Sequence, residues 1–168
     1  MTRIIGIDPG SRYTGFGVID IVGRSERYVG CGRINSMAGS MAERLNLIFT
    51  RLGEVIHEYR PDEAALEETF VNRVNAASAL VLGQARGVAF CALGVKGLTV
   101  AEYSASQVKQ AVTGSGRADK AQIQQMVCLL LKLEAAPVSD AADALAVALT
   151  HARATRMATG QAYAGSWK

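Results

Sequence analysis

Residues 3–21, RIIGIDPGSRYTGFGVIDI, contain two runs of apolar and β-branched residues separated by a turn sequence with proline and glycine. Such runs favour β-strands, and short glycine-containing turns between them favour antiparallel neighbours. A third run of the same type follows a second glycine-containing turn. The sequence therefore predicts an antiparallel meander of three strands, at Arg3–Asp8, Tyr13–Ile21 and Glu26–Asn35.

The rest of the chain alternates helices with short strands, without repeats or low-complexity tracts. Helical spacing of apolar residues and capping residues set the expected helix bounds. Helices are expected over Met41–Tyr59 (capping box Ser40 to Glu43), Ala76–Leu93, Ser104–Val112, a stretch after the Asp119 cap, and Asp140–Arg156 after a Ser139 cap. Strands are expected over Glu63–Thr69 and Leu98–Glu102. This order predicts an α/β fold with a five-stranded mixed sheet flanked by helices.

Composition indicates one folded domain. The chain has 168 residues, of which 49% are hydrophobic and 20% charged, enough to bury a core. We expect a single domain over residues 1–156 and a flexible tail over 157–168. The three cysteines, Cys31, Cys91 and Cys128, are odd in number, widely spaced and set in apolar surroundings, which predicts buried free thiols in a reducing cytoplasm rather than disulfides or a zinc site.

The N-terminus lacks the layout of a signal peptide. No apolar stretch is expected to reach the roughly 20 residues of a membrane span. The sequence therefore predicts a soluble cytoplasmic protein with no membrane partner.

Four carboxylates stand at the ends of apolar segments. Asp8 and Glu67 close two predicted strands, and Asp140 and Asp143 lie three residues apart at the start of the last helix. If the two strands are parallel neighbours at the sheet centre, their carboxyl ends meet where α/β sheets bind ligands. The four charges would then repel one another by several kcal/mol at an effective dielectric of about 20. A divalent cation with oxygen ligands, Mg²⁺ or Mn²⁺, removes that repulsion.

Each acid also has a simpler interpretation. Asp140 and Asp143 can serve the dipole at the helix N-terminus, and Asp8 begins an Asp-Pro-Gly turn signal. Glu67 has a second glutamate beside it. It is the coincidence at three places that favours a metal site.

Charge is unevenly distributed. From Phe70 to Lys132 the chain has seven basic and two acidic residues, and from Glu43 to Glu68 it has seven acidic and three basic residues. A polar molecule of this kind can bind a polyanion on one face. An ordinary solvated surface explains the same counts.

Five segments, in this order, carry a family resemblance: IIGIDPGSRYTGFGVI, AALEETF, SALVLGQARGVA, YSASQVKQAVTGSGRADKAQIQQMV and DAADALAVALTH. Over about residues 2–152 the chain resembles the RuvC family of bacterial Holliday-junction endonucleases. The resemblance implies a ribonuclease H-like fold. It implies that Asp8, Glu67, Asp140 and Asp143 bind metal, with two Mg²⁺ ions per site and Mn²⁺ as a substitute, and catalyse hydrolysis.

The resemblance also implies a substrate and partners. The enzyme would cut two opposed strands of a four-way DNA junction in recombination and repair, leaving 5′-phosphate and 3′-hydroxyl ends. Lys109, Arg117 and Lys120 would hold phosphates beside the acidic cluster. Phe70 would stack on an unpaired base at the junction centre, next to the DNA-binding candidate Arg73. The RuvA–RuvB branch-migration complex would be a partner.

Two equivalent scissile strands and one acidic cluster per chain predict a two-fold symmetric homodimer. The candidate interface is the helix Ala76–Leu93, which is apolar around much of its circumference. The alternative is that this helix is sandwiched inside one chain. His151, further along the last helix, is expected at the surface, with a role in orienting a ligand as the alternative.

Two other functions stay open. The Gly6–Gly10 segment, with Thr14 and Gly15 after it, also resembles the phosphate loop of actin-like ATPases, although this chain has the length of only one of their two lobes. A junction-binding protein that does not cleave is the other alternative, and the complete acidic quartet argues against it.

Overall fold

Five strands form one mixed sheet in the order β3-β2-β1-β4-β5. The structure is a computed structural model that describes residues 1–68 and 76–158. The strands are β1 (Thr2–Asp8), β2 (Tyr13–Val22), β3 (Ser25–Asn35), β4 (Glu63–Glu67) and β5 (Val100–Tyr103). β1, β2 and β3 pair antiparallel, whereas β4 pairs parallel with both β1 and β5. The predicted meander, the mixed sheet and the central β1–β4 pair are confirmed.

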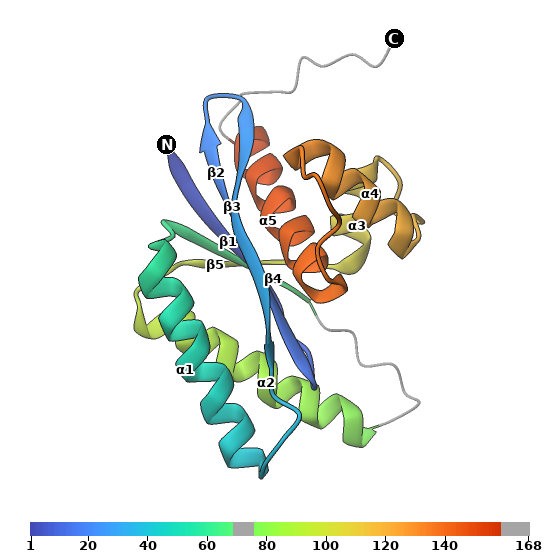
Figure 1. The fold of residues 1–168 in the computed structure, drawn as a ribbon. Coiled ribbons are helices and arrows are strands. Elements are labelled where there is room, and N and C mark those ends of the chain that lie inside the picture. Colours follow the sequence, from blue (N-terminus) through green and yellow to red (C-terminus); the bar gives the residue numbers. More distant parts are fainter. Residues whose placement is uncertain (69–75, 159–168) are drawn as a thin grey trace.

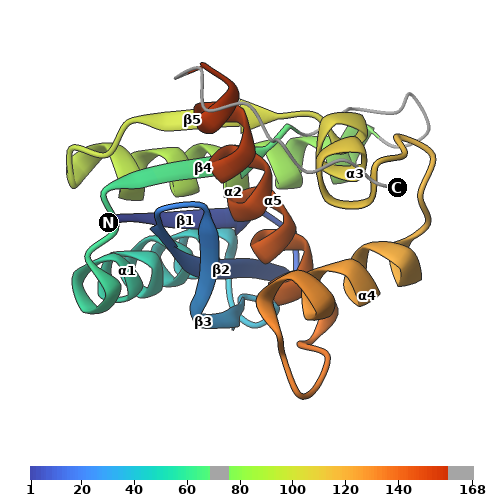
Figure 2. The same cartoon turned by 90° about the horizontal axis from the view of Figure 1, so that it is seen from above.

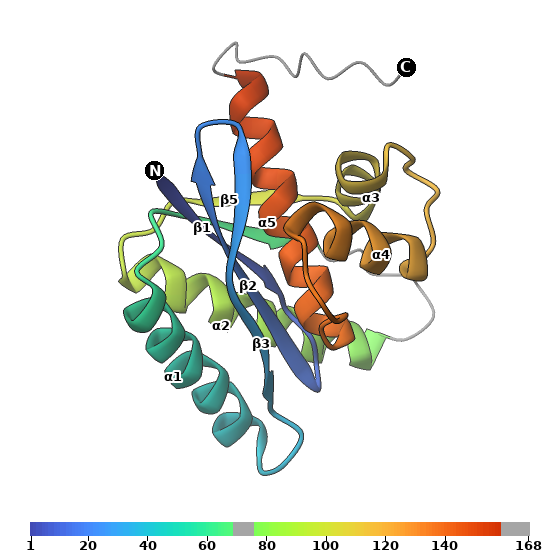
Figure 3. The same cartoon turned by 45° about the horizontal axis from the view of Figure 1, so that its top comes forward.

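Helices cover both faces of this sheet. They are α1 (Met41–Tyr59), α2 (Ala76–Val95), α3 (Ala105–Thr113), α4 (Lys120–Leu131) and α5 (Ser139–Ala158). α1 and α2 lie on one face (Figures 1 and 2). α5 crosses the other face, with α3 and α4 beside it (Figure 3).

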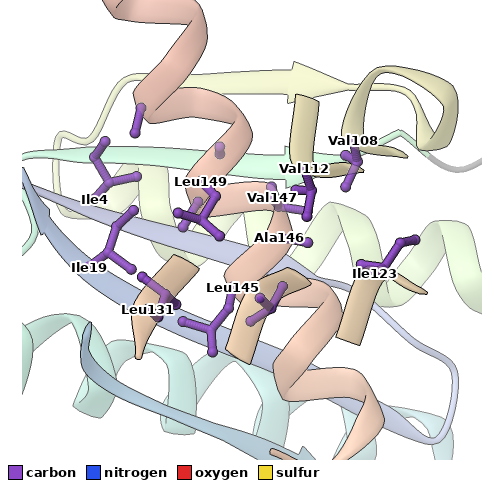
Figure 4. Close-up of a cluster of buried hydrophobic side chains, with 14 of the residues drawn as sticks. Ile4, Ile19, Val108, Val112, Ile123, Leu131, Leu145, Ala146, Val147 and Leu149 are labelled. Carbon is purple, nitrogen blue, oxygen red and sulfur yellow. The ribbon is translucent and has the colours of Figure 1, made fainter. Parts of the chain in front are cut away.

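Strand alternation sorts the core into two clusters, one on each face of the sheet. Ile4 of β1 packs with Ile19, Leu145 and Leu149 on the α5 side (Figure 4). Ile5 and Ile7 point the opposite way, into the cluster that α1 and α2 cover. Because successive strand residues face opposite sides, Asp8 points to the same face as Ile4. That face is the one covered by α5.

Capping residues explain where most helices begin. Ser40, Ser104 and Asp119 each form a capping box with the residue three positions later, an arrangement that contributes about 1 kcal/mol per helix. The predicted caps at Ser40 and Asp119 are confirmed. The predicted Ser139 cap is wrong, because Ser139 is already helical and its buried Oγ has no hydrogen-bond partner among the described residues.

Element ends differ from prediction by two residues or fewer where the structure describes them. α5 continues to Ala158, so the predicted tail from residue 157 begins too early. β4 ends at Glu67, and residue 69 of its predicted extension lies outside the described residues, as do Phe70, Arg73 and residues 159–168 of the predicted tail. Cys31, Cys91 and Cys128 are free thiols, as predicted, but the predicted burial is wrong, because Cys91 is exposed and the other two are only partly buried.

Helix α2 is apolar but poorly covered. By length and composition its 20 residues, with a hydropathy of 1.5, would suffice to cross a membrane, and 22% of that window is buried. The prediction that no stretch reaches that length is therefore wrong, although helices of soluble proteins also meet this criterion. Ala85, Ala89, Ala92 and Leu93 face the core. Leu80 is 66% exposed, so the described part of the chain leaves one side of α2 uncovered, contrary to the sandwiched alternative.

Candidate active site

One row of residues crosses the sheet at the carboxyl end of β1. Asp8 pairs with Gly15 of β2, and Gly15 pairs with Arg33 of β3. On the other side of Asp8, Ile7 pairs with Leu66, so the next residues along the two parallel strands are Asp8 and Glu67. Both carboxylates point to the α5 face by strand alternation. The two acids that were predicted to lie side by side do so.

Three glycines on this face let α5 approach the sheet closely. A Cβ on Gly6 would lie 2.2 Å from the carbonyl oxygen of Ala144, and one on Gly17 would lie 2.7 Å from the nitrogen of Leu145. A Cβ on Gly15 would lie 2.0 Å from the carbonyl oxygen of Asp140. Any side chain at these positions would push the helix away. The glycines therefore place the first turn of α5 directly against the strand next to Asp8.

The four carboxylates influence one another. The pKa of Asp8 rises from 3.8 to about 7, first because the group is buried and then because Glu67, Asp143 and Asp140 repel its charge. The pKa of Glu67 also rises, through burial and repulsion from Asp143. β1 and β4 pair and α5 packs against both, so the predicted convergence of these three elements is confirmed; the metal-binding role of the four acids stays a prediction.

Basic side chains offset part of that negative charge. Nζ of Lys120 lies 2.8 Å from Oδ2 of Asp143, and this hydrogen bond raises the pKa of Lys120. Lys109 and Lys120 both favour the ionised form of Glu67. Arg33, which sequence reasoning missed, lies 3.6 Å from Asp140.

A cavity of about 230 Å³ opens beside these groups. Its described lining consists of Glu67, Ala105, Val108, Lys109, Lys120, Ile123, Asp143 and Ala146. Two of the three predicted phosphate-binding residues, Lys109 and Lys120, thus lie at the acidic site. Arg117 is exposed in the α3–α4 connection and is not among these lining residues.

The donor set suits a hard divalent cation. Among residues 1–68 and 76–158, no three His, Cys, Asp or Glu side chains are placed to hold one ion together. Two of the four carboxylates are instead engaged by Lys120 and Arg33. The negative charge of this site raises the pKa of Asp8 and is partly neutralised by the side chains of Lys120 and Arg33. Binding of a further positive charge is therefore favourable. Carboxylate oxygens are the ligands that Mg²⁺ and Mn²⁺ prefer, so the residues fit such an ion.

His151 is buried, which corrects its predicted surface position. It is 8% exposed. Its Nδ1 lies 2.8 Å from the Tyr103 hydroxyl and its Nε2 lies 2.9 Å from Oε2 of Glu63. These partners are distant in sequence, which is why the helical pattern alone did not reveal them. The three residues join α5 to β4 and β5.

The comparisons with known proteins agree with one family. The family model described as crossover junction endodeoxyribonuclease RuvC matches residues 4–151. The RuvC endonuclease of Chromobacterium violaceum is 56% identical over 160 residues, covering 95% of this chain and 90% of that protein. RuvC of Thiobacillus denitrificans is 55% identical over 155 residues, covering 92% and 90%.

Solved structures give the same result. Thermus thermophilus RuvC in complex with a Holliday junction substrate is 38% identical, with a TM-score of 0.88, and covers 95% of this chain and 98% of that one. The yeast mitochondrial Holliday junction resolvase Ydc2 is 11% identical, with a TM-score of 0.63, and covers 89% and 78%. The second similarity concerns the fold alone.

Proposed function

The chain belongs to the RuvC family of crossover junction endodeoxyribonucleases, and from this premise we propose that it resolves four-way DNA junctions by metal-dependent hydrolysis. The observation that carries the proposal is geometric: Asp8 and Glu67 end neighbouring strands, and the first turn of α5, with Asp140, packs against Gly15, the ladder partner of Asp8. The structure of T. thermophilus RuvC with a Holliday junction substrate supports the choice of substrate. The fold is ribonuclease H-like, and we assign residues 1–158 to one nuclease domain, because α5 ends at Ala158.

Asp8, Glu67, Asp140 and Asp143 would hold the metal, which we propose to be Mg²⁺, with Mn²⁺ as a substitute and two ions per site. Bound divalent ions activate a water for attack on phosphorus and stabilise the leaving oxygen. Asp8 and Glu67 must be ionised to serve as ligands, and the cations Lys120 and Lys109 favour that state. Cleavage would leave a 5′-phosphate and a 3′-hydroxyl.

Binding of the DNA falls to the basic side chains. Lys109 and Lys120 line the cavity beside Glu67 and Asp143, where they would contact phosphates without reading sequence. Arg117 would contact DNA further out. Phe70 and Arg73, outside the described residues, remain DNA-binding proposals from the family resemblance.

A homodimer would place two acidic sites on one junction. The uncovered side of α2 carries Leu80 together with the small residues Gly83, Gly87 and Cys91. A second copy of α2 related by a two-fold axis would cover this surface. We propose the RuvA–RuvB branch-migration complex as a further partner, and the bacterial cytoplasm as the location.

The experiment that tests the function compares the two chemistries. The protein is incubated with Mg²⁺ and an end-labelled four-way junction, and separately with Mg²⁺ and ATP. We expect paired nicks in opposed strands and no release of phosphate from ATP. ATP hydrolysis without nicking would favour the nucleotide-binding alternative, and junction binding without nicking would favour the non-cleaving alternative.

A further inference from the structure

Arg33 is a cation at the acidic site that the four-carboxylate mechanism leaves unused. Its guanidinium lies 3.6 Å from Oδ2 of Asp140. Its Cζ lies 4.3 Å from the centroid of the Tyr13 ring. Arg33 stands in the same row of the sheet as Asp8, with only Gly15 between them. Two separate contacts thus hold this charge at the edge of the site.

The contact with Asp140 is easily exchanged. The side chain of Arg33 is 43% exposed and that of Asp140 is 27% exposed, and ion pairs this accessible to water contribute little net stability. Lys120 is 60% exposed and differs in distance: its Nζ lies 2.8 Å from Oδ2 of Asp143, within hydrogen-bond range, whereas the 3.6 Å between Arg33 and Asp140 is too long for a hydrogen bond. A divalent cation bound to Asp140 would therefore displace the guanidinium at small cost.

The contact with Tyr13 does not depend on the metal. A guanidinium over an aromatic ring is held by the ring's quadrupole and keeps its hydrogen-bond donors free at the edge. Once displaced from Asp140, Arg33 would remain beside the site with those donors unused. A DNA phosphate is the group that a planar guanidinium binds with two parallel hydrogen bonds.

We propose, on the basis of the proposed function, that Arg33 pairs with Asp140 until a divalent cation binds there. Arg33 then contacts a phosphate of the junction strand at the acidic site. It is thus both a competitor of the metal and a phosphate-binding residue. Removal of the Arg33 side chain should therefore raise the affinity for the metal and lower the affinity for the junction.

The test measures metal binding and DNA binding separately, without cleavage. Free Mn²⁺ is titrated by electron paramagnetic resonance with protein alone, and junction affinity is measured in Ca²⁺ across a range of salt concentrations. For Arg33→Ala we expect Mn²⁺ to bind about threefold more tightly, because a competing cation is lost. Junction affinity should fall, and the slope of its logarithm against log salt should decrease by about one.

Arg51→Ala is the matched control. This substitution removes the same charge from a different place. The guanidinium of Arg51 lies 2.7 Å from Glu54 on α1, and α1 covers the opposite face of the sheet (Figure 1). The substitution should change neither quantity. Arg33→Lys keeps the charge and should return Mn²⁺ affinity toward that of the parent.

Equal Mn²⁺ affinity in Arg33→Ala and Arg51→Ala, or equal salt slopes, would overturn the proposal for Arg33. Failure of the proposed function itself is a different result, because the unaltered protein would then leave the junction uncut in Mg²⁺. Melting temperatures of the variants, which should match the parent, exclude unfolding as the cause of either change.

Discussion

The carbonyl oxygen of Asp140 lies 2.0 Å from the place that a Cβ on Gly15 would occupy. Gly15 is also the β-ladder partner of Asp8. The absent side chain at this one position therefore sets the separation between the first turn of α5 and the strand end that carries Asp8. Packing and the acidic site depend on the same contact.

Gly15→Ala should lower the free energy of unfolding by about 1–3 kcal/mol, as overpacking does in well-packed interiors. The atom that the new methyl group meets is backbone and cannot rotate away, so α5 must shift. Junction cleavage should fall with it, because Asp140 moves relative to Asp8. Urea unfolding and a cleavage time course measure the two effects.

Gly53→Ala is the control for that substitution. A Cβ on Gly53 of α1 would meet no atom within 4 Å, and alanine within a helix is favoured over glycine by roughly 0.5–1 kcal/mol. This variant should be at least as stable as the parent and should cleave normally. Equal stability of the Gly15 and Gly53 variants would contradict the close-packing argument.

Stability without metal should decrease as the pH rises through the range in which Asp8 titrates. The pKa of Asp8 is about 7 in the native state, whereas the ordinary pKa of an aspartate, which applies to the unfolded chain, is 3.8. The native state therefore binds more protons than the unfolded chain between these values, and the free energy of unfolding falls as pH increases. Glu67, whose pKa is also raised, acts in the same direction.

Melting temperatures in EDTA at pH 5 and pH 8 check this expectation. Asp8→Asn removes the titrating group. The melting temperature of this variant should therefore fall less between pH 5 and pH 8 than that of the parent. Mg²⁺ affinity should show the opposite trend and rise with pH, because the ligands must be deprotonated. A parent that loses no more stability than Asp8→Asn would argue against a buried, repelled carboxylate.

The α2 surface should mediate self-association. Leu80→Glu places a charge on the uncovered apolar side of α2 and should weaken the dimer about tenfold or more, measured by sedimentation equilibrium. Leu129→Glu on α4 is a matched control, because Leu129 is 68% exposed and Leu80 is 66% exposed. A parent protein that sediments as a monomer at micromolar concentration, with and without junction DNA, would refute the dimer.

Phe70→Ala should reduce junction cleavage about tenfold or more, with little change in melting temperature. Base stacking on an aromatic ring contributes about 1–3 kcal/mol, and that contribution would be lost. A phenylalanine of the core behaves differently, since its truncation costs about 3–5 kcal/mol of folding stability. A large fall in melting temperature would assign the ring to the core instead of the DNA.

The sequence was sufficient for features that depend on local pattern. The ends of two apolar runs predict that Asp8 and Glu67 lie at strand ends. The three-residue spacing of Asp140 and Asp143 predicts that both lie on one side of α5. Capping rules located Ser40 and Asp119. In each case the deciding residues lie within a few positions of one another, so periodicity and turn chemistry reveal them.

Features that depend on register across distant segments were missed. Arg33 lies near Asp140 because its ladder partner Gly15 packs directly against the start of α5. The sequence predicts a surface position for His151, but this side chain is buried and contacts Tyr103 and Glu63. Gly15 and Gly17 alternate on β2 and carry a signal for close helix packing, yet the sequence does not say which helix packs there.

Cleavage by Asp8→Asn tests the central claim, that four carboxylates form one metal-dependent nuclease site. In saturating Mg²⁺ this variant should cut a labelled four-way junction about a hundredfold more slowly or worse, since even outer-shell changes cost 10–100-fold. It should bind the junction as tightly as the parent in Ca²⁺. The control Asp62→Asn, one residue before β4 and at the opposite end of that strand from Glu67, should cut normally. Cutting by Asp8→Asn at the parent rate would contradict the account.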